Sequence, residues 1–250
     1  MSDYHSQTRS IPTGRADMAV DAGLRAFMLG VYNKMALGLL LSAVLAYVAG
    51  TVAPVTQFVF GTPFIFVVMF GPLAILLISA FTMRNPSPAA ANLVYWSVVS
   101  LIGVSLGYWI LRAAAGQLGG TYEAGMLTIM KAFLVTAASF GALSLWGYTT
   151  KRDLSGFGTF LIMGLIGLII ASIVNMFIAS SALSFAISVI GVLVFAGLTA
   201  FDTQRLKFMY YQVGGDARAA SVTTTYGALS LYINFINLFQ FILSLMSARN

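Results

Sequence analysis

The sequence predicts an all-α, polytopic membrane protein with seven transmembrane helices. Only 8% of its 250 residues are charged, against roughly a quarter in soluble domains. Apolar residues make up 59% of the chain, and the mean hydropathy is +0.91. A water-soluble fold could not cover its surface with so few charges, so soluble enzymes are excluded. Helices are expected because each one satisfies its own backbone hydrogen bonds within lipid.

Residues 1–24 are polar and lack the apolar core and cleavage site of a signal peptide. We expect a retained, irregular cytoplasmic tail over 1–24 and a single seven-helix membrane domain over 25–250. Apolar blocks then follow that are long enough for the ~20 helical residues needed to cross a bilayer. The expected spans are 27–50, 63–83, 91–112, 126–147, 157–179, 182–201 and 224–247. Breaks rich in Pro, Gly or charge separate them, and a very short turn at Ser180-Ser181 predicts a tight hairpin.

The basic residues orient these spans. With the N-terminus inside, the inner segments contain nine Lys or Arg residues and the outer ones two, Arg112 and Arg249. The inner set is Arg9, Arg15, Arg25, Arg84, Lys151, Arg152, Arg205, Lys207 and Arg218. This bias follows the positive-inside rule and places the C-terminus outside. The net charge of +6 and the pI near 9.7 therefore record topology, and we predict no nucleic-acid partner.

Few residues could support catalysis. The chain has no Cys, and its one His, His5, lies in the polar tail, which excludes thiolate chemistry and a membrane-buried imidazole. Gly103-Val-Ser105-Leu-Gly107 matches the G-x-S-x-G pattern of a nucleophile elbow, but inside an apolar span it favours close helix packing. An aspartyl intramembrane protease needs two carboxylates that share a proton, and only Asp202 could face the bundle. We predict a protein that is not an enzyme and has no cofactor.

The seventh span has one polar face. At 100° per residue, its small and polar residues fall within an arc of about 100°: Gly227, Ser230, Asn234, Asn237 and Ser244. Asparagines deep in a membrane helix should face protein or water. The face is either an interhelical hydrogen-bond seam or the lining of a polar cavity or ion path. A similar stripe in the fifth span, Gly164, Gly167, Ala171 and Asn175, predicts a packing face.

Asp202 follows the sixth span in the segment Phe201-Asp202-Thr203-Gln204-Arg205. Its simplest interpretation is an interfacial acid that is neutralised by Arg205 at i+3. Arg84, at the end of the second span, lies on the same predicted side, so an interhelical pair of Asp202 with Arg84 is a second interpretation.

Four segments resemble the Bax inhibitor-1 family (transmembrane Bax inhibitor motif proteins), in its bacterial branch, over roughly residues 22–247. They are the entry to the first span, Arg25–Gly38; the connection Ala142–Gly156; Phe201-Asp202-Thr203-Gln204; and Leu229–Phe239. Their order along the chain makes the resemblance specific.

The resemblance implies a seven-helix bundle with a central last helix and a pH-sensitive calcium leak across the bacterial inner membrane. It also implies that an Asp of the sixth helix and an Asp of the seventh share a proton beside the pore, with an Arg of the second helix pairing to the former. Asp202 and Arg84 match two of these positions. Asn234 stands at the third, which weakens the expected pH sensing because no second carboxylate repels the first.

We therefore predict a cation leak lined by the second, sixth and seventh helices, with Asp202, Asn234, Arg84, Asn237 and Ser230 along the path. Asp202 would be a weak transit site for calcium, the transported ion, which prefers oxygen ligands. The alternative, also implied by the resemblance, is a non-conducting regulator that binds and tempers a membrane-anchored ATP-dependent protease through the tail 1–24.

Overall fold

The computed structural model describes residues 13–83, 85–213 and 215–248, and this part of the chain forms eight α-helices and no strands. In chain order the helices are α1 (Thr13–Thr51), α2 (Ala53–Phe60), α3 (Phe64–Thr82), α4 (Pro88–Ala114), α5 (Tyr122–Thr149), α6 (Ser155–Ile178), α7 (Ser181–Gln212) and α8 (Ala217–Ser247). All except α2 are long and apolar enough to cross a membrane. The predicted fold class, a polytopic bundle of seven membrane-spanning helices, is confirmed.

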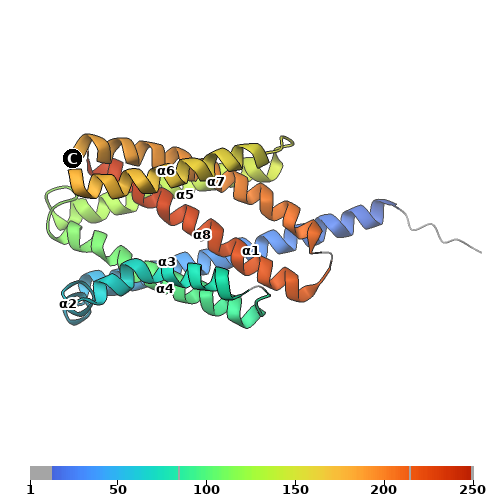
Figure 1. The fold of residues 1–250 in the computed structure, drawn as a ribbon, viewed down its shortest axis with the longest axis horizontal. Helices are drawn as coiled ribbons and strands as arrows, with labels where there is room; N and C mark the ends of the chain where they lie inside the picture. The colour runs from blue at the N-terminus through green and yellow to red at the C-terminus, as the bar shows by residue number, and fades with distance from the viewer. Residues whose placement is uncertain (1–12, 84, 214, 249–250) are drawn as a thin grey trace, which may run out of the picture.

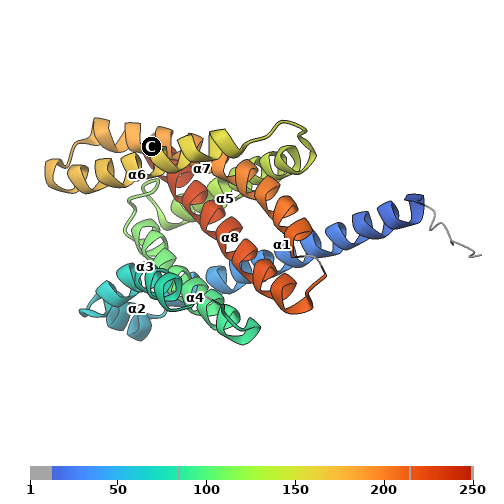
Figure 2. The ribbon, with the colours of Figure 1, turned by 45° about the vertical axis from the view of Figure 1, so that its right-hand side comes forward.

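Helix α8 forms the centre of the bundle. It runs obliquely between one group of helices, α1, α3 and α4, and a second group, α5, α6 and α7 (Figures 1 and 2). It contacts α1, α4, α5 and α7. In its most apolar stretch of 18 residues, 56% of the residues are buried, against 11% in the corresponding stretches of the outer helices α3 and α6. The start of α1 and the end of α8 lie at opposite ends of the bundle (Figure 1), as an odd number of spans requires.

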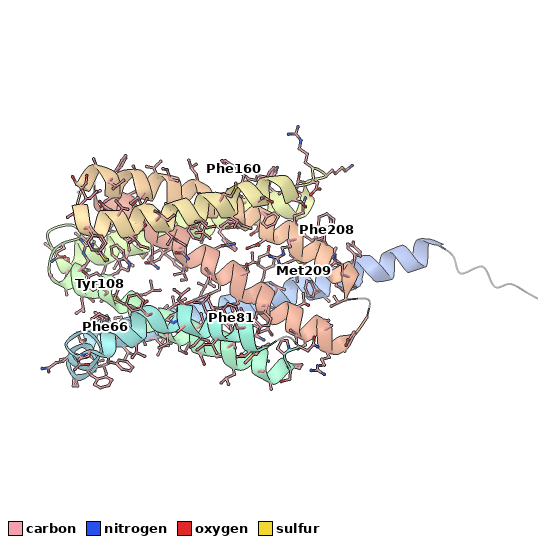
Figure 3. The ribbon with its side chains drawn as sticks, viewed as in Figure 1. Phe66, Phe81, Tyr108, Phe160, Phe208 and Met209 are labelled. Atoms are coloured by element: carbon pink, nitrogen blue, oxygen red, sulfur yellow. The ribbon has the colours of Figure 1, made fainter. Side chains whose placement is uncertain are left out.

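The outer surface is apolar. Phe66, Phe81 and Phe160 project away from the bundle (Figure 3) and are more than half exposed. In water such a surface would be an aggregation hazard, but around a transmembrane bundle it is the face that contacts lipid.

Three features of the helices differ from the sequence prediction. The segment expected to be a loop between the first two spans contains α2, which starts with Pro54 in its first turn, where proline is compatible with a helix. Helix α1 begins at Thr13, inside the expected irregular tail, and α7 continues past residue 201 to Gln212. Hydropathy marks where a helix leaves the apolar layer, whereas the backbone hydrogen bonds of the helix continue beyond it.

The Gly103–Gly107 segment packs α4 closely against α1, as predicted. A Cβ added to Gly103 would lie 2.7 Å from the Cα of Ser42, and one at Gly107 would lie 2.9 Å from the Cβ of Ala49. Ser105 donates its hydroxyl hydrogen bond to the carbonyl of Ile102 in its own helix. The small residues of the G-x-S-x-G pattern therefore allow α4 and α1 to pack closely.

The predicted packing stripe of the fifth span is only partly correct. A Cβ added to Gly164 would contact Val194 of α7 at 3.3 Å, whereas Gly167 is exposed, with nothing within 4 Å of an added Cβ. The short turn between α6 and α7 is confirmed. There, Ala179 adopts a left-handed conformation with φ of 54°, which ends α6 sharply.

Candidate functional site

Asp202 lies inside α7 and is buried between α7 and α8. Its carboxylate oxygen Oδ2 accepts two hydrogen bonds from α8: one from Ser230 Oγ at 2.6 Å and one from Asn234 Nδ2 at 2.7 Å. Asp202 and Asn234 are 8% and 5% exposed. The structure thus brings together three of the predicted site residues at one junction of two membrane helices.

The interpretation of Asp202 as an interfacial acid neutralised by Arg205 is wrong. Arg205 is exposed, while the Asp202 carboxylate turns inward to the two donors on α8. Side chains at i and i+3 are neighbours on a helix, but here the Asp202 carboxylate bonds α8 and the Arg205 side chain is exposed, on a helix that continues to Gln212. Hydrogen bonds to an ionised group are shorter and stronger than neutral ones, and these two replace the expected ion pair.

Arg84 lies outside the described residues, in the connection between α3 and α4. Its pairing with Asp202 therefore stays a prediction.

Asn237 lies one turn beyond Asn234 on α8 but does not share in the hydrogen bonds to Asp202. Its Nδ2 donates to the carbonyl of Ile233 at 2.9 Å, and its side chain lines a separate cavity of about 280 Å³ between α6, α7, α8 and Trp109 of α4. Nearby, Asn175 Nδ2 donates to Ser184 Oγ at 2.7 Å, and Ser188 Oγ donates to Ser244 Oγ at 3.1 Å. The polar face of α8 therefore serves two places, the Asp202 junction and this cavity.

Gln204 positions the connection between α5 and α6, a role that the sequence analysis did not assign to it. Its buried amide accepts from the backbone N–H of Leu154 at 2.9 Å and donates to the carbonyl of Arg152 at 2.7 Å. These bonds fasten the connection between α5 and α6 to α7, two residues from Asp202. The signal in the sequence that could have identified Gln204 was its place in Phe201–Gln204, one of the four segments that carry the family resemblance.

Lys34 is a second residue that the prediction left aside. Its Nζ donates to Asn92 Oδ1 of α4 and, at 2.7 Å, to Thr225 Oγ1 of α8, and it lies 5.6 Å from the ring centroid of Tyr95. A lone lysine within an apolar segment was the available signal, since charged groups inside membranes are rare and generally face the bundle. It ties α1, α4 and α8 together on the face of α8 remote from Asp202.

The arrangement around Asp202 offers one buried carboxylate, one hydroxyl and one amide. Within the described ranges, no three His, Cys, Asp or Glu side chains come together as a metal cluster. Fold and site together define the class of protein. It is a multi-pass helical membrane protein in which side chains of the central helix α8 donate hydrogen bonds to a buried acid of the neighbouring helix α7.

Comparisons with known proteins agree with this class. The family model described as Inhibitor of apoptosis-promoting Bax1 matches residues 24–250. A protein of Caulobacter vibrioides is 55% identical over 254 residues, 98% of this chain and 97% of the relative. A protein of Rickettsia prowazekii is 41% identical over 249 residues, 100% of this chain and 99% of the relative. The inner membrane protein YbhL of Escherichia coli K12 is 39% identical over 241 residues, covering 94% and 97%. The chain belongs to the Bax inhibitor family, and the resemblance noted from the sequence is confirmed.

Proposed function

We propose that the protein is a cation leak of the Bax inhibitor type, with calcium as the transported ion and a path along the junction of α7 and α8. The second span, which the prediction also placed along the path, is α3, and it packs mainly against α4. The observation that carries this proposal is the buried Asp202 carboxylate, which is held by Ser230 and Asn234 at 2.6 and 2.7 Å. A buried acid inside a membrane bundle is expensive and typically marks an ion or substrate pathway.

The chemistry of the junction favours a transit site over a storage site. Calcium takes six to eight oxygen ligands, and this junction supplies one carboxylate with hydroxyl and amide oxygens beside it. One acidic ligand binds calcium weakly, and conduction requires binding that is weak enough for the ion to leave. Asp202 would thus attract the cation, while Ser230 and Asn234 turn from donors into oxygen ligands by rotating their side chains.

We also propose that the chain lies in the bacterial inner membrane with its N-terminus inside and its C-terminus outside. The relative YbhL is named an inner membrane protein, and the nine-to-two distribution of basic residues supports this orientation. The Lys151-Arg152 connection lies at the same end of the bundle as the start of α1 (Figure 1).

The test is calcium entry into proteoliposomes that contain the full chain and a trapped calcium dye, measured from pH 5 to 8. We expect entry above that of empty vesicles, and slower entry for Asp202→Asn, which keeps the shape of the site but removes its charge. Rates equal to empty vesicles at every pH would reject the leak. The alternative role, as a partner of a membrane-anchored protease, would then be tested by pull-down from membranes with and without residues 1–12, which precede α1.

A further inference from the structure

The junction of α7 and α8 continues past Asp202 toward the C-terminal end of α8. On α8, the residues that face α7 recur at helical spacing from Ser230 through Asn234 and Phe241 to Ser244. On α7, the matching positions run back from Asp202 through Phe195 and Gly191 to Ser188. Two contacts prove the register: Ser188 Oγ bonds Ser244 Oγ at 3.1 Å, and the rings of Phe195 and Phe241 stack with centroids 5.9 Å apart.

Near this end, the cavity of about 280 Å³ is lined by polar side chains from three helices. They are Ser172 and Asn175 of α6, Ser184 and Ser188 of α7, and Asn237, Gln240 and Ser244 of α8. Polar groups in contact with hydrocarbon are costly, so such a set within membrane helices should face water or protein. The volume is enough for several water molecules, each of which takes about 30 Å³ in the liquid.

Two aromatic rings separate this cavity from Asp202 on the α7 side. Phe195 is buried, and Phe241 stacks on it at an interplanar angle of 29°. Phe241 also rests directly on the backbone at Gly191, where an added Cβ would lie 2.6 Å from its ring atoms. Because any larger residue at 191 would collide with the ring, the absent side chain at Gly191 creates the notch that holds Phe241 in the seam.

We propose that this cavity is the water-filled outer vestibule of the ion path, and that the Phe241 ring, seated on Gly191 and Phe195, is the apolar barrier between the vestibule and Asp202. The inference rests on the proposed cation leak and deepens it. A hydrated cation enters the vestibule, where neutral amide and hydroxyl oxygens substitute for part of its water. An apolar constriction then blocks it, since such constrictions gate by excluding water.

Single cysteines can test this directly because the chain has no native Cys. Ser244→Cys places a thiol in the vestibule, and Ser230→Cys places one beside Asp202. Ile190→Cys, on the half-exposed outer face of α7, is the lipid-facing control at the depth of the barrier. The full-length variants are reconstituted in vesicles and treated with a cationic, membrane-impermeant methanethiosulfonate on one side at a time.

We expect Ser244→Cys to react from the side of the C-terminus, while Ile190→Cys does not and Ser230→Cys reacts several-fold more slowly than Ser244→Cys. Adding Phe241→Ala to Ser230→Cys should raise its labelling rate several-fold from that side. Phe241→Leu, which keeps an apolar side chain and preserves folding better, should give a smaller increase. Phe239→Ala is the matched control, because Phe239 faces α5, where its ring lies 6.4 Å from that of Phe133; it should leave the rate unchanged.

Ser244→Cys that reacts no faster than Ile190→Cys would overturn the vestibule. Ser230→Cys that reacts as fast as Ser244→Cys, or that is unaffected by both Phe241 variants, would overturn the barrier. Calcium entry measured in vesicles that contain the native chain separates this inference from the proposed function. Labelling as expected without calcium entry rejects the calcium leak and retains the vestibule, whereas calcium entry with the opposite labelling pattern rejects the vestibule alone.

Discussion

Replacing Asn234 by Asp should give the junction a pH dependence that the native residue does not supply. In the native chain, Asn234 Nδ2 donates to Asp202 Oδ2 at 2.7 Å. Asn234→Asp substitutes an acceptor for this donor and places two carboxylates within hydrogen-bond distance. Two unit charges about 4 Å apart repel by about 4 kcal/mol at an effective dielectric constant of 20. The pair therefore resists losing its second proton.

This repulsion gives the direction of the effect. Because two nearby carboxylates resist being ionised together, the pair keeps one proton to a higher pH than a single carboxylate does. While it keeps that proton the pair has one charge, and after losing it the pair has two. Calcium entry and calcium binding by the variant should accordingly increase from pH 5 to 8, because site affinity rises with ligand charge.

The assay is calcium entry into dye-loaded proteoliposomes at pH 5 to 8, with calcium affinity measured by titration on the same protein. Asn237→Asp is the matched control: it adds the same charge one turn further along α8, where the native amide bonds Ile233 and not Asp202. It should show no such increase from pH 5 to 8. An Asn234→Asp variant that is folded and matches the native protein in both curves would refute the coupling of residues 202 and 234.

Three further predictions concern the site and its supports. Asp202→Asn should flatten any preference for divalent over monovalent cations in flux assays, because it removes the charge while preserving the shape of the site. Gln204→Leu should lower the thermal midpoint in detergent, because it unpairs the buried N–H of Leu154 and the partly buried carbonyl of Arg152, and a buried unpaired group costs about 1–3 kcal/mol; the exposed Gln57→Leu should have little effect. Gly103→Ala should destabilise by about 1–3 kcal/mol through overpacking, whereas Gly141→Ala, with nothing within 4 Å of an added Cβ, should not.

Hydropathy and residue spacing predicted most of the fold. Each of the seven expected spans overlaps a long helix, because the length of an apolar run is fixed by the thickness of the bilayer. The same signal could not detect α2, whose eight residues are too few to cross a membrane. It also ended the sixth span at residue 201, since the polar residues that follow lower the hydropathy without interrupting the helix.

The candidate site was predictable in its parts but not in its contacts. Periodicity placed Ser230 and Asn234 on one face of the last span, and the position of Asp202 at the end of the sixth span, together with the family resemblance, singled out that acid. Neither could determine that Asp202 would turn away from Arg205 toward α8, because that choice depends on how two distant helices pack. Lys34 and Gln204 were missed for the same reason. The partners of Lys34 are 58 or more residues away in the sequence, and those of Gln204 are about 50 residues away.

The two faces of α8 differ in a way that bears on how a path could open. Toward α1 and α4, Tyr232 is fully buried and its hydroxyl lies 2.7 Å from Ser42 Oγ, which donates to the carbonyl of Val99. Toward α7, Asn234 is buried, but Ser230 and Asn237 are only partly buried. Between membrane helices, packing and hydrogen bonds provide the association that the hydrophobic effect provides in water. The buried Tyr232 and its hydrogen bond therefore fix α8 to α1 and α4. We expect any movement that opens the path to occur between α8 and α7, at the seam where the carboxylate and the aromatic barrier both lie.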